Sequence, residues 1–414
     1  MDKLLVVGGG IGGLSAALAC AQAGAEVHLF ERSAGFTEVG AGVQLGPNVV
    51  KVLQGWGLNS ALQAVAAYPD RLQVRCASSG AELGVSRLGQ VFEQRYGAPY
   101  LTVHRADLHA LLLEAVRQEA GVALHTHSAA TRFSQTDSGV SLHLSDVLQV
   151  QGDALVGADG GWSRIRQNLL GDGVPRPTGH LAYRAMVDQA GMPPALRSEQ
   201  VTAWLGPKLH VVQYPVRGGK WLNVVAIVHG QVKGDMSNWD HSANALDLQH
   251  CMEKTCAPLQ DLIGAIGQWR LWPLSIRAPM RGAHEHAQGR IALLGDAAHP
   301  MVPYLAQGAG MAIEDASVLA QEFCSMAADP LHTVAQRLGR YAARRWERNA
   351  RVQACAIRNG EIFHASGLMR LGRNAAMRIL GEKLLDQPWL YGWSEAIKKA
   401  VNSKPFTTAV EMLA

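Results

Sequence analysis

The sequence predicts an α/β fold in which a doubly wound domain is interleaved with a β-rich domain and followed by C-terminal helices. Three observations predict this fold. The chain opens with a strand–helix–strand pattern, strand-like segments dominate from about residue 180 to about residue 272, and a strand of the first type returns near residue 289. The chain has 414 residues, of which 48% are hydrophobic and 17% charged, so it can bury the cores of two or three domains.

A nucleotide-binding unit is predicted at the N-terminus. Leu4–Val7 is a short apolar run typical of a buried strand, and it leads into a G-x-G-x-x-G pattern formed by Gly8, Gly10 and Gly13. A helical pattern follows, and then a second strand that ends at Glu31. These glycines let a pyrophosphate approach the helix N-terminus, and the acid can accept hydrogen bonds from a ribose. The pattern predicts a Rossmann-like dinucleotide site, which FAD and NAD fit equally because both carry an ADP half.

Two later strands end in an acidic turn. Asp159 follows the apolar strand of "VGADGGWSRIR", and Asp296 follows the strand of "LLGDAAHP". Ligands of α/β sheets bind at the carboxyl ends of the strands, so Asp296 is expected to face a polyol hydroxyl. A helix then opens with Gly308, Ala309 and Gly310. Small residues there let a flat ring system lie against the backbone, and the helix dipole would stabilise negative charge on that ring.

The domain boundaries follow from these shifts in pattern. The β-rich domain is predicted from two stretches, a hairpin at 71–100 and the main part at 180–275. The nucleotide-binding domain is predicted from three stretches, 1–70, 101–179 and 276–330, and the C-terminal helices from 331–414.

Composition excludes several classes of protein. The net charge of +4 is too mild to indicate nucleic-acid binding. The six cysteines form no C-x-x-C pair, which favours free thiols in a reducing cytoplasm, and no apolar run is long enough to span a membrane. The "HEH" at 284–286 lacks the H-E-x-x-H spacing and is expected in a solvated loop, so no metal site is predicted.

Taken together, the three motifs resemble the class A flavoprotein aromatic hydroxylases, the p-hydroxybenzoate hydroxylase-like family, over roughly residues 3–378. Within that family, the chain is most similar to the salicylate, 3-hydroxybenzoate and 6-hydroxynicotinate hydroxylases. The segments that carry this similarity are "GAGVQLGPN", "LTVHRADLHALL", "WLGPKLHVVQYPVRGG" and "GDAAHPMVPYLAQGAGMAIEDA". The resemblance implies bound FAD, with NADH or NADPH as a transient co-substrate, because no second Rossmann unit is visible. Relatives are often dimers, so a homodimer is compatible with the resemblance.

The resemblance also implies a set of cofactor-binding residues. Glu31 and Arg32 would hold the adenosine part of FAD, Gln44 would lie beside the flavin, and Arg105 would contact the ribitol–pyrophosphate side. Asp296 would hold the ribitol. The full set is Gly8, Gly10, Gly12, Gly13, Leu14, Glu31, Arg32, Gln44, Arg105, Asp159, Asp296, Gly308, Ala309, Gly310 and Met311.

The substrate is expected to meet the β-rich domain. His210 and Tyr214 are four residues apart in "HVVQY", so in a strand they share one face. A histidine of ordinary pKa, about 6.5, can take the proton of a phenol near neutral pH. His210 is therefore the predicted base, Tyr214 is predicted to orient the substrate hydroxyl, and Tyr304 is predicted to close the site. Arg184 and Arg217 are candidates for binding a carboxylate, although a surface or structural role is expected for each.

The activity that the resemblance implies is hydroxylation of a small phenolic aromatic acid. NAD(P)H would reduce FAD, and O₂ would add to it to give a flavin hydroperoxide that attacks the ring of the phenolate. The run "HPMVPY" is more similar to the salicylate and hydroxynicotinate members, which favours salicylate and decarboxylative hydroxylation. The alternatives are 3-hydroxybenzoate, 6-hydroxynicotinate and quinolone or quinone precursors. Trp162 and Pro303 depart from the usual pattern of relatives. Two readings outside hydroxylation stay open: a flavin or NAD-dependent dehydrogenase, and an FAD-binding redox sensor.

Overall fold

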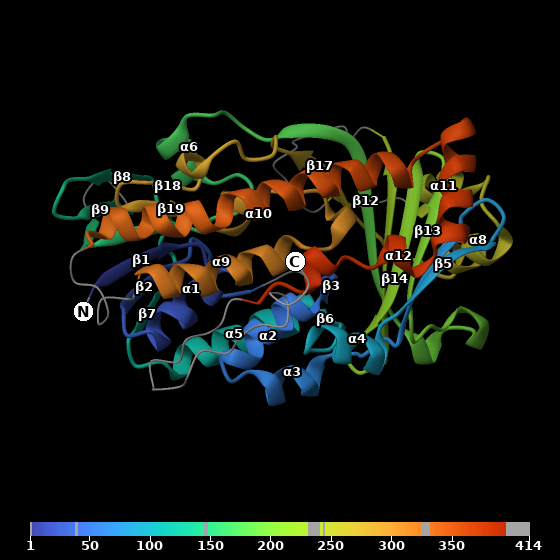
Figure 1. Ribbon diagram of the computed structural model, residues 1–414, viewed down its shortest axis with the longest axis horizontal. Helices are drawn as coiled ribbons and strands as arrows, with labels where there is room; N and C mark the ends of the chain where they lie inside the picture. Colours follow the sequence, from blue (N-terminus) through green and yellow to red (C-terminus); the bar gives the residue numbers. More distant parts are fainter. Residues whose placement is uncertain are drawn as a thin grey trace, which may run out of the picture.

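Two sheets lie towards opposite ends of the long axis of the molecule, and helices pack around and between them (Figure 1). The computed structural model describes residues 2–37, 40–144, 148–230, 241–242, 245–323 and 332–394. The α/β architecture with a separate β-rich sheet, predicted from the sequence, is confirmed.

The first sheet has six strands in the order β18-β19-β11-β1-β2-β7, and all of its pairs are parallel except β18 with β19. Its central strands are buried on both faces, which explains their apolar sequences. The strands are β1 (Lys3–Val7), β2 (Glu26–Phe30), β7 (Val122–His125), β11 (Ala154–Gly157), β18 (Ala287–Gln288) and β19 (Ile291–Leu293).

The second sheet has eight strands in the order β16-β17-β12-β15-β14-β13-β4-β5 and is antiparallel except between β13 and β4. Apolar side chains of α7 and α8 cover one face of this sheet. The strands are β4 (Arg71–Cys76), β5 (Glu82–Arg87), β12 (Arg176–Asp188), β13 (Val201–Gly206), β14 (Leu209–Val216), β15 (Trp221–His229), β16 (His241–Ser242) and β17 (Arg270–Ile276).

Two smaller sheets and the helices complete the described fold. The smaller sheets are β3 (Gly42–Leu45) with β6 (Leu101–His104), and β8 (Arg132–Gln135), β9 (Val140–His143) and β10 (Gln149–Gly152). The helices are α1 (Ile11–Gln22), α2 (Pro47–Gly55), α3 (Asn59–Val65), α4 (Gly89–Tyr96), α5 (Arg105–Gln118), α6 (Arg164–Leu170), α7 (Ala245–Met252), α8 (Ala257–Gly264), α9 (Gly308–Phe323), α10 (Val334–Phe363), α11 (Gly367–Leu380), α12 (Glu382–Leu385) and α13 (Pro388–Tyr391). No described helix is both long and apolar enough to cross a bilayer.

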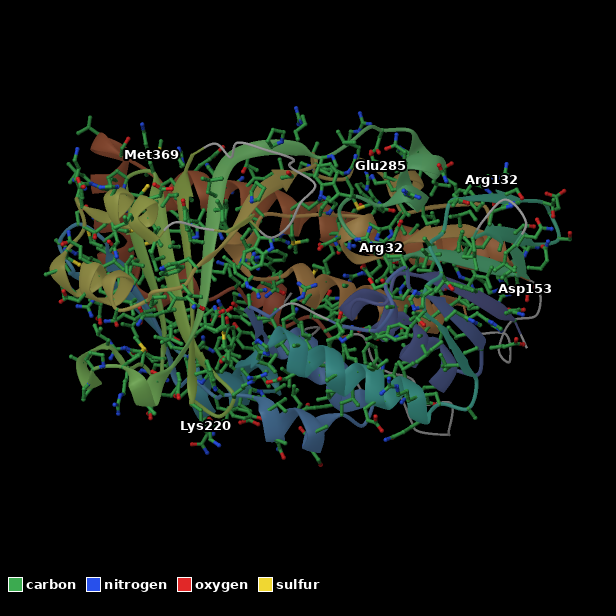
Figure 2. All side chains as sticks on the ribbon, turned by 180° about the vertical axis from the view of Figure 1, so that it is seen from behind. Arg32, Arg132, Asp153, Lys220, Glu285 and Met369 are labelled. Carbon is green, nitrogen blue, oxygen red and sulfur yellow. The ribbon has the colours of Figure 1, made fainter. Side chains whose placement is uncertain are left out.

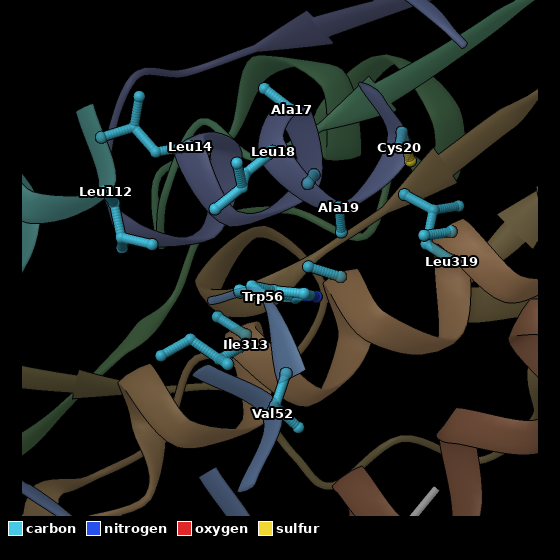
Figure 3. Packing of buried hydrophobic residues seen from close by; sticks show 14 of the residues in the cluster. Leu14, Ala17, Leu18, Ala19, Cys20, Val52, Trp56, Leu112, Ile313 and Leu319 are labelled. Carbon is cyan, nitrogen blue, oxygen red and sulfur yellow. The ribbon is translucent and has the colours of Figure 1, made fainter. Parts of the chain in front are cut away.

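The helix after the glycine-rich loop is held by a tight apolar core. Leu14 and Leu18 of α1 belong to the same buried cluster as Ile313 and Leu319 of α9, with Trp56 beside them (Figure 3). Contacts of this kind fix the N-termini of α1 and α9 relative to each other. Both helices begin at the same cavity, which is described below.

The long helix α10 runs along the molecule and passes both sheets (Figure 1). Its Arg345 is buried and donates to Asp315 of α9 at 2.7 Å, while its Nη1 lies 2.9 Å from Glu314. Asp315 also accepts hydrogen bonds from the backbone N–H of Gly295 and from His299. The network therefore fixes the turn that carries Asp296.

The structure corrects one local expectation from the sequence. His286 does not lie in a solvated loop: it is fully buried, and its Nε2 accepts a hydrogen bond from Asn349 at 3.0 Å, whereas His284 is exposed. On α2, which begins after Gly46, the Asn48 amide donates to Glu314 at 2.7 Å. Cys20 and Cys76 are buried thiols, Cys251 is exposed, and Cys324 lies outside the described residues.

Candidate active site

A cavity of about 770 Å³ lies between the two large sheets. Its walls come from the glycine-rich loop and strand ends of the six-stranded sheet and from one face of the eight-stranded sheet. Arg32, at its rim, lies near the middle of the long axis (Figure 2). This volume is in the range of sites that bind cofactors and small substrates.

The glycine-rich loop is shaped for close approach of a ligand. Gly8 has a positive φ of 108°, and an added Cβ would lie 2.4 Å from the carbonyl oxygen of Ala158. A Cβ at Gly13 would lie 1.8 Å from the carbonyl oxygen of Gly8, so only glycine lets α1 pack against the loop. Gly8, Gly10 and Gly12 line the cavity; Gly13 is not among the residues that line it, and Leu14 is fully buried in the core.

Glu31 stands at the end of β2 and lines the same cavity. Its carboxylate accepts hydrogen bonds from the backbone N–H of Gly9 at 2.7 Å and of Ser33 at 2.9 Å. Burial works against the charged form, but these bonds outweigh it and lower the pKa of Glu31. Glu31 is therefore an ionised acceptor beside the loop.

The two acidic turns behave differently. Asp159 lines the cavity, but its carboxylate accepts hydrogen bonds from the hydroxyl of Ser163 at 2.5 Å and from the N–H of Arg164 at 2.7 Å, at the start of α6. Burial raises the pKa of Asp159 despite these bonds. Asp296 is exposed on the cavity wall, and a Cβ added to Gly308 would lie 3.9 Å from its Oδ1. Asp296 thus faces the start of α9.

The first residues of α9 divide between the cavity and the core. Gly308 and Ala309 line the cavity, whereas Met311 is fully buried in an apolar cluster. A Cβ at Gly310 would lie 2.8 Å from Val49 of α2, so this glycine serves helix packing. Gln44 and Arg105 also line the cavity.

His210 and Tyr214 of β14 both line the cavity, although each is almost fully buried. Nδ1 of His210 is hydrogen-bonded to Nε2 of His364 at 2.6 Å. Burial, with the neighbouring His364 and His180, puts the pKa of His210 well below 6.5, so the imidazole is neutral at pH 7. Burial likewise raises the pKa of Tyr214, so its phenol stays protonated and can donate a hydrogen bond.

Tyr304, predicted to close the site, is not among the residues that line the cavity. Its hydroxyl is hydrogen-bonded to Nδ1 of His180 at 2.5 Å, and its ring packs edge-on against His210 with centroids 5.0 Å apart. Tyr304 therefore stands behind His210. Its neighbour Pro303 lines the cavity, as does Trp162.

The two arginines considered for a carboxylate have different surroundings. Arg217 is bound in a two-point ion pair to Asp107, with both N···O distances 2.7 Å. Arg184 of β12 lines the cavity, and its Cζ lies 4.9 Å from the ring centroid of Trp272. Its Nε is buried without a hydrogen-bond partner among the described residues, and burial lowers the pKa of Arg184 to about 10.

Histidines form two groups in the described part of the chain that could place three metal ligands together. They are His180, His229 and His364 beside the cavity, and His286, His299 and Asp315 beneath the turn of Asp296. The sequence predicted no metal site and did not bring any of these residues together. Each of these histidines has at least one ring nitrogen in a hydrogen bond within the protein, whereas Nδ1 of His286 and Nδ1 of His299 are buried without a hydrogen-bond partner among the described residues.

The profile of the FAD-binding-domain family matches residues 2–355 of this chain. The chain is 36% identical to a 3-hydroxybenzoate 6-hydroxylase from Klebsiella oxytoca over 95% of its own length and 97% of that protein. It is 37% identical to a 6-hydroxynicotinate 3-monooxygenase from Bordetella bronchiseptica over 85% of its length and 89% of that protein. Among solved structures, it resembles Klebsiella pneumoniae HpxO complexed with FAD and uric acid, with a TM-score of 0.81, 26% identity and coverage of 93% and 94%. It also resembles a salicylate hydroxylase substrate complex, with a TM-score of 0.79, 26% identity and coverage of 95% and 96%.

The chain belongs to the family of FAD-binding-domain proteins. Within it, the chain is an FAD-dependent monooxygenase of the class A aromatic hydroxylase type, as the sequence motifs predicted. The cavity fits FAD on its own features: a loop that side chains would fill, a helix N-terminus without a side-chain cap, and acidic acceptors at two strand ends.

Sequence reasoning missed three histidines and did not reveal the surroundings of one arginine. His180, His229 and His364 come from β12, β15 and the end of α10, and no local pattern marks them. Arg184 was considered, but its burial beside an apolar wall depends on the pairing of β12 with β15 and β17. A signal was present in "LAYRAMVD", where an arginine interrupts an otherwise largely apolar strand.

Proposed function

We propose that this chain hydroxylates a small phenolic aromatic acid, with NAD(P)H and O₂ as co-substrates. The observation that carries the proposal is the guanidinium of Arg184 on the cavity wall, whose Nε is buried and lacks a hydrogen-bond partner among the described residues. A buried unpaired donor on a charged group is costly, so such a group is a candidate for pairing with a ligand. A carboxylate would pair with it and could accept two hydrogen bonds.

The surroundings of Arg184 favour an aromatic ligand. Trp272, Val225 and Ile227 line the same wall of the cavity. They give a flat apolar ring a surface to bury, while the arginine fixes one end of the molecule. A charged end and an apolar ring together describe an aromatic acid.

His210 and Tyr214 supply the groups that a phenol needs. His210 is neutral at pH 7 and can therefore accept the proton of the substrate hydroxyl. Tyr214 remains protonated and can donate a hydrogen bond to the oxygen that loses the proton. Deprotonation makes the ring a stronger nucleophile at the positions ortho and para to the oxygen.

FAD, when bound and reduced by NAD(P)H, supplies the activation of O₂. Glu31, Asp296 and the N-terminus of α1 would hold its ribose, ribitol and pyrophosphate, and the start of α9 would lie along its ring. Apolar walls such as those of Val212 and Val225 would exclude water from the reacting ring once the ligands fill the cavity. The protein's own contribution is thus orientation, proton removal and exclusion of solvent.

The sequence identities of the named relatives rank the candidate substrates. Three relatives named 3-hydroxybenzoate 6-hydroxylase are 35–36% identical to this chain, whereas the salicylate hydroxylase structure is 26% identical. We therefore place 3-hydroxybenzoate first among substrates to test. 6-Hydroxynicotinate comes second, because two relatives named 6-hydroxynicotinate 3-monooxygenase are 35–37% identical over 85% of this chain. Salicylate, which the sequence run "HPMVPY" favoured, comes third.

Replacing Arg184 by methionine should raise KM for 3-hydroxybenzoate roughly tenfold to hundredfold, because the hydrogen bond between the charged guanidinium and the substrate carboxylate is lost. The neutral analogue 3-hydroxybenzamide has no charge for Arg184 to bind, so its KM should change far less. Steady-state NADH oxidation with product analysis gives both constants.

Arg281→Met is the matched control, because this arginine side chain is 85% exposed and lies away from the cavity walls. It should leave both constants unchanged. Equal losses for the acid and the amide in Arg184→Met would show that the arginine shapes the wall and does not bind a carboxylate. If no hydroxylated aromatic acid in the panel stimulated NADH oxidation by FAD-loaded protein, the proposed function itself would fail.

A further inference from the structure

Three imidazoles are hydrogen-bonded in series from the cavity wall to the protein surface. Nδ1 of His210 meets Nε2 of His364 at 2.6 Å, and Nδ1 of His364 meets Nε2 of His229 at 3.0 Å. His210 lines the cavity, His364 is buried directly after α10, and His229 is exposed at the end of β15. We propose that His364 and His229 form a relay that carries the proton of the substrate hydroxyl from His210 to solvent; this inference rests on the proposed function.

The atom pattern of the series lets a proton pass without leaving a charge behind. A neutral imidazole has one N–H donor and one acceptor nitrogen. If each Nδ1 carries the hydrogen, His210 donates to His364 and His364 donates to His229. Nε2 of His210 then gains the substrate proton, each hydrogen bond passes one proton on, and Nδ1 of His229 releases one to water. Each ring ends neutral with its hydrogen moved to Nε2. A proton that enters from solvent at Nδ1 of His229, with release of the Nε2 hydrogen of His210 to the phenolate oxygen of the product, resets the series.

Burial keeps the three imidazole rings neutral, which is the state that this transfer needs. Burial is the largest cause that lowers the pKa of each ring, to about 3 for His364, and the neighbouring histidines lower the pKa values of His210 and His364 further. A protonated His210 would be buried and costly, so a base at this place needs a way to pass its proton on. His364 provides the only contact of this kind among the hydrogen bonds of His210 in the described structure.

The groups around the series hold it in place. His180 of β12 stacks on His229 with ring centroids 4.4 Å apart, and the hydroxyl of Tyr304 binds Nδ1 of His180. The carbonyl of His364 accepts the N–H of Lys208 at 3.1 Å, which joins the end of α10 to the sheet. The nearby cations are Lys208, which lowers the pKa of His229, and Arg373, which lowers that of His364. No carboxylate is among the groups that shift the pKa values of His210, His229 and His364, so no negative charge beside the series holds the proton on one ring.

A metal ion is the competing reading of the same residues. His180, His229 and His364 place one ligand atom each within 4.8 Å of one another. However, His229 and His364 already share a hydrogen bond, and His180 binds Tyr304. Only the series that includes His210 reaches the cavity, which favours proton transfer.

The test follows deprotonation directly. FAD-loaded enzyme is mixed with 3-hydroxy-4-nitrobenzoate, an aromatic acid whose phenolate absorbs visible light, without NADH so that no turnover occurs. We expect His229→Gln to slow the appearance of the phenolate roughly tenfold or more, since positioned acid–base transfer is worth at least that factor. Added imidazole should restore the rate in His229→Gln, a rescue that a purely structural role would not give.

Two further variants test the middle ring of the series and provide a control. His364→Phe fills similar space without a ring nitrogen and should slow deprotonation without rescue by imidazole. His250→Gln replaces an exposed histidine of α7, away from the series, and should match the unaltered enzyme. Retained FAD fluorescence and circular dichroism exclude misfolding as the cause, and His229 is exposed, so its replacement is the milder change.

Unchanged deprotonation rates in both His229→Gln and His364→Phe would overturn the relay while leaving hydroxylation intact. If the nitro compound does not bind, proton release on binding the acid that the enzyme hydroxylates is followed with a pH indicator, and the same expectations apply. If the enzyme binds and hydroxylates no aromatic acid, the proposed function fails and the relay fails with it. The two failures are therefore distinguishable.

Discussion

Replacing His210 by glutamine should lower kcat with the best aromatic acid roughly 10²- to 10⁴-fold, the usual contribution of a positioned general base. Glutamine retains polarity and bulk but cannot accept a phenol proton. His210 lies on the β-rich wall and not on the glycine-rich loop, so FAD binding should be preserved. Stopped-flow measurement of substrate deprotonation and of product formation checks both statements.

The pH dependence adds a second expectation. Burial beside His364 and His180 puts the pKa of His210 well below 6.5, and no ionised carboxylate is among the groups that shift it. Because His210 acts as a base only in its neutral form, kcat/KM should not fall as the pH drops through 6.5. The acid limb of the pH profile of kcat/KM should instead lie at a pH below the ordinary pKa of histidine. His210→Gln should lose that limb, while FAD dissociation, followed by fluorescence, is scored separately.

The exposed His250 again offers the control, since His250→Gln should keep both the rate and the pH profile. A His210→Gln enzyme that deprotonates its substrate at the original rate would remove His210 from the role of base. In that case Tyr214, the other titratable group of β14 on this wall, would become the next residue to replace.

Replacing Arg345 by methionine should lower the free energy of unfolding by about 3–5 kcal/mol, the cost of removing one partner from a buried ion pair. Arg345 is 1% exposed and lies against both Asp315 and Glu314. Its loss leaves the buried Asp315 without its arginine partner, whereas Glu314 keeps Arg348. Asp315 also holds His299 and the N–H of Gly295. We therefore expect weaker FAD retention as well as a lower Tm, because the turn of Asp296 loosens.

Thermal and urea unfolding of the FAD-loaded protein measure the loss. Arg358→Met is the matched control, because Arg358 is an exposed arginine of the same helix. A change in Tm no larger for Arg345→Met than for Arg358→Met would show that α10 does not depend on this ion pair. Retention of FAD at a lowered Tm would show that the ion pair stabilises α10 but is not needed to hold the turn of Asp296.

Much of the nucleotide-binding part of the fold was predictable, because the residues that mark it lie close together in the sequence. The glycines before α1, the acid after β2 and the aspartate after β19 each follow a buried apolar strand, and parallel strands bring such ends to one edge. His210 and Tyr214 were also predictable as a pair, since residues four apart on one strand share a face. Their chemical roles remain predictions.

The features that the sequence left hidden depend on contacts between distant segments. His364 meets His210 across 154 positions of the chain, and that contact depends on where α10 ends against the eight-stranded sheet. Arg345 belongs to a helix rich in arginine, yet this side chain points towards α9 and is buried. Charge in a helical sequence does not reveal which positions face a carboxylate on another helix.

The measurement that tests the account most directly is incorporation of heavy-isotope-labelled O₂ into the product of 3-hydroxybenzoate, using FAD-loaded protein and NADH. The account predicts NADH oxidation that depends on the aromatic acid, and a product that carries one labelled oxygen on its ring. NADH oxidation that the acid does not stimulate, or an unlabelled product, with salicylate and 6-hydroxynicotinate behaving the same way, would contradict the assignment of this cavity to the hydroxylation of aromatic acids.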